Sequence, residues 1–192
     1  MTIPNPAALE FLRTRRSRPA KTLALPVPDR TALEPLLEAA LRVPDHGKLE
    51  PWRLIVLERH ALLRLAGLVP EVGARLDKAQ DEIAKQQAQF TDAHLAVAVI
   101  ESPKAAVKIP AIEQSYSAGC VCLGLLNAAL AAGWGANWLT GWASHDAGFG
   151  RAGLGLTPHE RIAGFIHIGT ESAAPPDRPR PDPATKVTWM AQ

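Results

Sequence analysis

The segment PAIEQSYSAGCVCLGLLNAALAAG, residues 110–133, contains the most apolar stretch of the chain and predicts a long central helix. Pro110 suits the first turn of a helix, because its fixed φ is helical and its missing N–H has no partner to lose there. Beyond Ser117 nearly every face of the helix is apolar, which predicts burial. One seam with 4-3-4-3-4 spacing predicts packing against another helix, and its members are Ile112, Tyr116, Gly119, Leu123, Leu126 and Leu130.

Shorter apolar runs on both sides of this helix predict the strands of a sheet. The expected strands are residues 52–57 (WRLIVL), 94–100 (HLAVAVI), 136–140 and 163–168 (AGFIHI). Further helices are expected at residues 7–14, from residue 31 onwards, at 70–90 and at 157–162. This order of elements predicts one α+β domain over residues 1–192, with helices around one sheet. Residues 172–184 contain five prolines, so this tail has no regular structure of its own and must lie on another surface.

Composition limits the classes of function. A chain of 192 residues suits one domain, and a net charge of +2 does not favour nucleic-acid or membrane partners. The N-terminus lacks the apolar region of a signal peptide, and the apolar run 118–133 is shorter than the roughly 20 residues that span a bilayer. The two cysteines, Cys120 and Cys122, suit reduced thiols. We therefore expect a soluble, cytoplasmic protein.

A cluster of five cations is the first candidate site. Within nine residues lie Arg13, Arg15, Arg16, Arg18 and Lys21, with Ser17 among them. Arginine forks bind phosphate through two hydrogen bonds, and a serine hydroxyl adds a neutral one. Two other interpretations stay open: a solvated helix end, and a nucleic-acid-binding arm, although the aromatic residues typical of such an arm are missing here.

Two further segments carry chemistry. Arg42, Asp45 and His46 share one loop, but no second histidine lies at ligand spacing, so we expect no metal. Residues 134–142 (WGANWLTGW) combine three tryptophans with glycines, which indicates either packing or a close backbone approach to a flat ligand. The common dinucleotide, P-loop and nucleophile-elbow motifs are missing from the sequence.

An ordered series of short motifs resembles the nitroreductase family, in particular its small branch of NAD(P)H nitroreductases from enteric bacteria. The series covers nearly the whole chain and comprises Arg15-Arg16-Ser17, Arg42-Val-Pro-Asp-His46, Glu50-Pro-Trp-Arg53, Glu113-Gln114, Ser117-Ala-Gly-Cys120, Trp138-x-Thr140-Gly141, Gly164-Phe165, Gly169-Thr170, Pro181-Asp-Pro183 and Val187-Thr188.

The resemblance implies a central mixed sheet surrounded by helices, in an interlocked homodimer whose tail, residues 172–192, packs on the partner. It implies two FMN sites across the interface. The implied FMN contacts are Arg15, Arg16 and Ser17 at the phosphate and ribityl chain, Arg42 and His46, and, from the other subunit, Trp138, Leu139 and Thr140. The implied nicotinamide contacts are Ala128, Ala129, Leu130, Ala131, Ala132 and Gly133. From charge alone, Arg178 and Arg180 are added as phosphate contacts.

The implied activity is reduction of FMN by NADH or NADPH, followed by ping-pong reduction of a nitroaromatic or quinone-like acceptor. The flavin carries this chemistry, so no side chain is expected to be an obligatory acid or base. Two features depart from the family pattern: Glu50 stands before Pro51, and Leu139 replaces a cation. Two alternatives remain at this point: a flavoprotein of the same fold with other redox chemistry, and a non-enzymatic regulatory or nucleic-acid-binding domain that uses Arg13 to Lys21.

Overall fold

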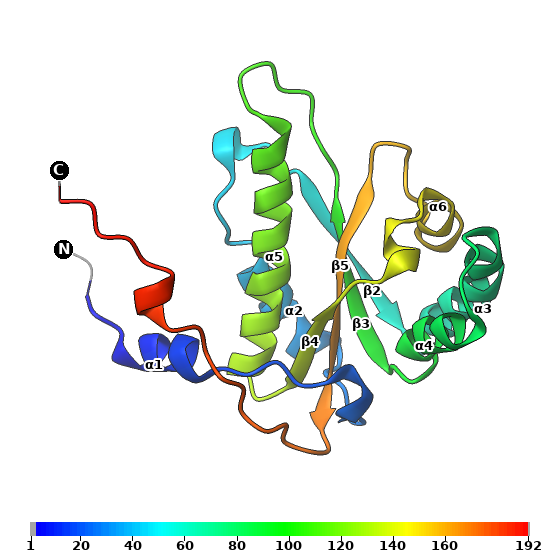
Figure 1. Ribbon diagram of the computed structural model, residues 1–192, viewed down its shortest axis with the longest axis horizontal. Coiled ribbons are helices and arrows are strands. Elements are labelled where there is room, and N and C mark those ends of the chain that lie inside the picture. The colour runs from blue at the N-terminus through cyan, green and yellow to red at the C-terminus, as the bar shows by residue number, and fades with distance from the viewer. Residues whose placement is uncertain (1–2, 192) are drawn as a thin grey trace.

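The computed structural model describes residues 3–191, in which one sheet lies between two layers of helices (Figure 1). Four strands lie side by side in the sheet, and a short fifth strand pairs with Thr170 and Glu171, at the C-terminal end of one of them. In order across the sheet the four are β2 (Trp52–Glu58), β3 (Leu95–Glu101), β5 (Arg161–Glu171) and β4 (Gly135–Leu139), with β1 (Leu23–Ala24) as the short fifth strand. The α+β class with helices around a central sheet is confirmed.

The direction of the strands differs from the expected mixed sheet, because every pair within residues 3–191 is antiparallel. The connection from β2 to β3 shows the physical reason. Two helices that pack on each other leave the end of β2 and return to it, so Glu58 pairs with Leu95 and the next strand must run in the opposite direction.

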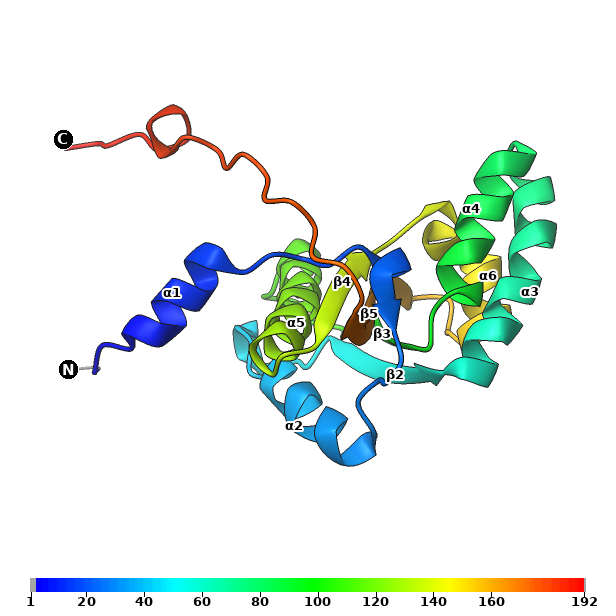
Figure 2. The ribbon, with the colours of Figure 1, turned by 90° about the horizontal axis from the view of Figure 1, so that it is seen from below.

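Each face of the sheet has its own helices, as Figures 1 and 2 show. One face carries α2 (Arg30–Ala40) and α5 (Ala111–Ala131), and the other carries α3 (Arg59–Arg75), α4 (Gln80–Thr91) and α6 (Ala147–Leu154). All of β3 is buried, and its residues alternate between the two cores. A strand covered on both faces reads as a continuous apolar run, which is why this strand was predictable from sequence.

The predictions of two helices, at residues 70–90 and 157–162, were wrong. The single helix expected at 70–90 is two, because the chain turns between α3 and α4, where Asp77 has a φ of +52°. The helix expected at 157–162 is a turn followed by β5, and α6 forms before it instead. Asp146 caps α6 by accepting a hydrogen bond from the Phe149 N–H at 2.7 Å. Helix α6 was not predicted from the sequence, because it contains three glycines and glycine is a poor helix former.

The central helix α5 is present, but one of its faces is not covered. Of the expected seam, Leu126 is buried, whereas Ile112, Tyr116 and Leu123 are 54%, 65% and 43% exposed. The exposed members of the seam, Ile112, Tyr116 and Leu123, therefore lack a partner helix within the described part of this chain. No helix in residues 3–191 is both long and apolar enough to cross a membrane.

The two ends of the chain extend from the same side of the body (Figure 2). Helix α1 (Pro6–Thr14) contains no buried residue, and nearly all of residues 172–191 are exposed, including the short turn η4 (Pro183–Thr185). Trp189 and Met190 are 91% and 84% exposed. These apolar side chains have little contact with the rest of their own chain, and the packing of the tail on another surface stays a prediction.

Candidate functional site

The arginine segment, residues 15–18, is fixed against β4 by backbone contacts. The Arg18 N–H donates to the Ala136 carbonyl oxygen at 2.8 Å, and the Asn137 side-chain amide donates to the Arg18 carbonyl oxygen at 2.6 Å. The Arg18 guanidinium forms an ion pair with Glu171 on β5 at 2.9 Å. These contacts place Arg15, Arg16 and Ser17 beside the strand that leads into Trp138, Leu139 and Thr140.

Within this segment the arginines have few partners. Arg15 Nη2 donates to Ser17 Oγ at 2.9 Å, and Arg16 Nη1 donates to the Ser17 carbonyl oxygen at 3.3 Å. The Nε atoms of Arg15 and Arg16 are buried and have no hydrogen-bond partner in residues 3–191. Two buried donors on adjacent cations are suited to an anion with several acceptor oxygens, such as a phosphate.

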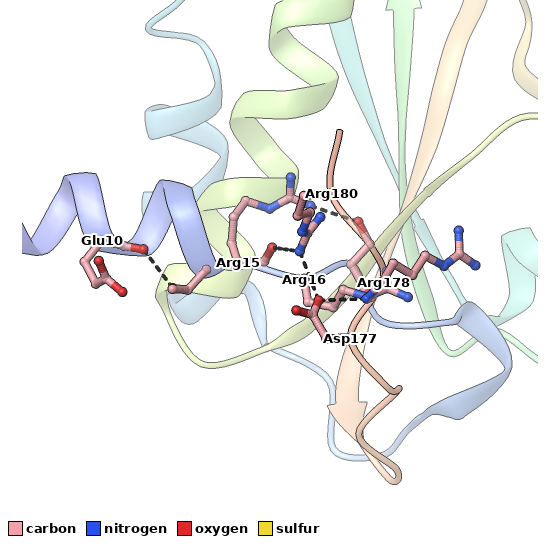
Figure 3. Close-up of polar contacts among 8 residues, drawn as sticks. Glu10, Arg15, Arg16, Asp177, Arg178 and Arg180 are labelled. Carbon is pink, nitrogen blue, oxygen red and sulfur yellow. Dashed lines mark hydrogen bonds and ion pairs between the residues drawn. The ribbon is translucent and has the colours of Figure 1, made fainter. Parts of the chain in front are cut away.

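The tail adds a third cation to this cluster. Arg180 Nη2 lies 3.4 Å from the Arg15 carbonyl oxygen and 3.4 Å from Asp177 Oδ1 (Figure 3). The pKa of Arg15 is lowered, first by burial and then by the nearby charges of Arg180 and Arg16. Since these cations repel one another, an anion bound among them gains more energy than it would at a single arginine. We call Arg15, Arg16, Ser17 and Arg180 the arginine cluster.

The residues that follow the arginine segment along the chain, Ala20 and Lys21, line a pocket with a volume of about 620 Å³. It lies between α4, the end of β4 and the turn η1 (Ala20–Thr22), and we call it the α4 pocket. Leu139 and Thr140 line it, together with Gly141. A side chain at position 141 would collide with Gln86 of α4, so only glycine allows this close approach of the loop to the helix.

Trp138 lies on the opposite face of β4 from Leu139, because side chains alternate along a strand. Its indole ring packs on Gly164 of β5, where a Cβ atom would collide with it. Of the three residues implied for the flavin on this strand, Leu139 and Thr140 therefore face the α4 pocket and Trp138 does not. The contacts of Arg18 with Ala136 and Asn137 place this strand beside the arginine segment of its own chain.

Arg42 and His46 lie elsewhere in the chain. The loop that carries them packs on the N-terminal half of α5: His46 Nδ1 is 2.6 Å from Glu113 Oε2, and Ser117 Oγ donates to the Pro44 carbonyl oxygen at 2.7 Å. This loop includes the turn η2 (His46–Lys48) and the exposed Glu50. The arginine segment instead contacts β4, which follows the C-terminal end of α5, and α5 has 21 residues and is about 30 Å long. One chain alone does not bring the two groups together.

The segment implied for the nicotinamide, residues 128–133, is the last turn of α5 and the turn into β4. Ala129 is buried, whereas Ala131, Ala132 and Gly133 are exposed. This segment shares the end of α5 with the arginine cluster, and Gly133 has a φ of +86°, which glycine adopts without strain.

The residues of the α4 pocket that were not predicted from the sequence include Gln86 and Gln89 on α4, and His167 on β5. The glutamines belong to a polar stretch with no distinctive spacing. His167 interrupts the apolar strand AGFIHI, and a polar residue within a buried run is the one signal that pointed to it.

The fold and the site describe an α+β domain with a cluster of arginines at the start of β4 and a pocket at its end. Residues 12–170 match the model of the nitroreductase family. A Haemophilus influenzae protein named "Putative NAD(P)H nitroreductase" is 34% identical over 165 residues, or 85% of this chain and 88% of its own length. An Escherichia coli relative is 32% identical over 184 residues, covering 95% of this chain and 99% of its own.

Solved structures agree with this match. A nitroreductase-like family protein from Bacillus cereus has a TM-score of 0.79 at 23% identity, with both chains covered completely. A nitroreductase from Desulfovibrio desulfuricans, solved in complex with FMN, has a TM-score of 0.74 at 20% identity and covers 98% of each chain. The chain belongs to the nitroreductase family and is an oxidoreductase of that family.

Proposed function

We propose that this protein is an FMN-dependent NAD(P)H oxidoreductase that works as a homodimer and reduces nitroaromatic or quinone-like acceptors. The observation that carries the proposal is the arginine cluster, whose two buried Nε atoms have no partner in residues 3–191, together with the α4 pocket that begins at Ala20 and Lys21. The names of the bacterial relatives and the FMN complex of the Desulfovibrio structure support the choice of reductant and cofactor.

The residues present fit FMN. Arg15, Arg16 and Arg180 would hold the phosphate with charge-assisted hydrogen bonds, and the Ser17 hydroxyl would add a neutral one. Leu139 and Thr140 line the pocket that would take the planar ring. Bound FMN would supply the two-electron chemistry, while the protein binds and orients it and shields it from water.

A homodimer would complete this site. The exposed seam of α5 suits a second copy of the same helix, because both copies present the same apolar side chains, Ile112, Tyr116 and Leu123. If the two α5 helices run in opposite directions, Arg42 and His46 of one chain approach the arginine cluster of the other. We expect residues 172–191 to pack on the partner in the same assembly and the thiols to stay reduced in the cytoplasm.

Steady-state kinetics test this function. Because reductant and acceptor share one pocket, we expect NAD(P)H and a quinone or nitroaromatic to give the parallel double-reciprocal lines of a ping-pong mechanism. Converging lines, which require a ternary complex, would contradict the shared pocket. A flavin-loaded protein that turns over none of these acceptors would instead favour a relative with other redox chemistry.

A further inference from the structure

His167 is buried on the central strand of the sheet, between Ala96 of β3 and Asn137 of β4. Its side chain faces the same side of the sheet as Phe165, whose ring packs on Phe90 of α4 with centroids 5.2 Å apart. Only 2% of His167 is exposed, and it forms part of the wall of the α4 pocket. The imidazole ring of His167 therefore occupies a position in the sheet that an apolar side chain would fill equally well.

Neither ring nitrogen of His167 has a hydrogen-bond partner in residues 3–191. Burial lowers the pKa of His167 to about 4, so the ring is neutral at pH 7 and offers one N–H donor and one lone pair. A buried polar group without a partner destabilises a folded protein. A ligand in the α4 pocket that hydrogen-bonds to the ring would remove this cost.

Gln89 offers a second buried donor to the same pocket. Its side-chain oxygen accepts a hydrogen bond from Gln86 Nε2 at 2.8 Å, while its own Nε2 is buried and has no partner in the described residues. Gln86 is 6% exposed, and its side chain lies against the loop at Gly141. The charged residues around the pocket, Lys21, Lys85, Glu82 and Asp92, carry no net charge together. The buried donors and acceptors that this pocket offers, on His167 and Gln89, are thus neutral.

We propose that His167 is a flavin-contacting residue, which hydrogen-bonds a heteroatom of the isoalloxazine ring and positions that ring in the α4 pocket. This inference rests on the proposed function, since it takes FMN as the ligand. A flavin ring suits these groups, because it is flat and neutral when oxidised and carries both carbonyl oxygens and ring nitrogens. The neutral imidazole can act as donor or acceptor, according to which nitrogen carries the proton.

Replacing His167 with phenylalanine tests the proposal with two readouts of opposite sign. His167→Phe keeps a flat ring but removes both nitrogens. Without FMN, we expect the melting temperature to rise by about 2–4 °C, because an unpaired buried polar group is removed. With FMN, we expect the dissociation constant to rise about three- to tenfold, the loss of one neutral hydrogen bond.

Two matched variants complete the experiment. His167→Gln keeps a donor and an acceptor, and we expect it to retain more FMN affinity than His167→Phe. Ser144→Ala removes another buried hydroxyl without a partner, one that does not line the α4 pocket, and we expect no change in FMN affinity. An unchanged dissociation constant in His167→Phe would overturn the proposal while wild-type FMN binding still stood. Failure of the wild-type protein to bind FMN would overturn the proposed function as well.

Discussion

Replacing Arg15 and Arg16 together with glutamine raises the dissociation constant for FMN by about a hundredfold to ten-thousandfold. Each arginine carries a buried Nε donor that has no partner in the described residues. A hydrogen bond to a charged group contributes about 1.5–3 kcal/mol, and two such losses give this range. Titration of the FMN-free protein, followed by quenching of flavin fluorescence, measures the effect.

Arg13→Gln is the matched control, because it removes one positive charge from the same basic run. Arg13 is 73% exposed on α1 and lies 3.9 Å from Glu10. An exposed pair of this kind contributes little, so we expect the FMN affinity of Arg13→Gln to stay within about twofold of wild type. If all the variants weakened binding equally, general electrostatic attraction and not the arginine cluster would hold the cofactor. The effect would then vanish at high salt.

Introducing glutamate at both Tyr116 and Leu123 separates the dimer and removes the flavin. These two side chains are 65% and 43% exposed in the single chain and lie on the apolar seam of α5. In a symmetric dimer each substitution occurs twice, so four apolar contacts are lost and four carboxylates are brought together. At about 1.5–3 kcal/mol per buried side chain, we expect at least a thousandfold weaker association.

Light scattering after size exclusion measures the outcome. We expect twice the chain mass of 20.6 kDa for the wild type and the single-chain mass for the double variant, which should also be colourless. Leu63→Glu on α3 is the control, because Leu63 is 42% exposed but lies away from the seam. A double variant that stayed dimeric, or a monomer that kept FMN, would contradict a site shared between subunits.

Hydrophobic pattern predicted most of the fold, and the failures have identifiable causes. The buried strand β3 and the helix α5 were predictable, because long apolar runs reflect burial directly. Helix α6 was not, since it forms through its Asp146 cap and close packing at glycines. Strand direction depends on how α3 and α4 pair, which local sequence does not encode.

The candidate site was predictable where it depends on charge. The cations from Arg13 to Lys21 indicated a phosphate site, and Arg180, which was added from its charge alone, lies 3.4 Å from the Arg15 carbonyl oxygen. The separation of His46 from this cluster along α5 could not be read from the sequence, because it depends on the length and direction of a packed helix. His167 was not predicted as a pocket residue, because the apolar residues around it in the sequence predict a core strand.

An absorption spectrum of the purified protein, taken with FMN and then with NADH or NADPH added anaerobically, tests the central claim most directly. We expect bound flavin with a yellow spectrum, which bleaches on addition of at least one of the two reductants. A colourless protein that takes up no added FMN would contradict the account, and the cluster from Arg13 to Lys21 would then be tested for salt-sensitive binding of nucleic acid.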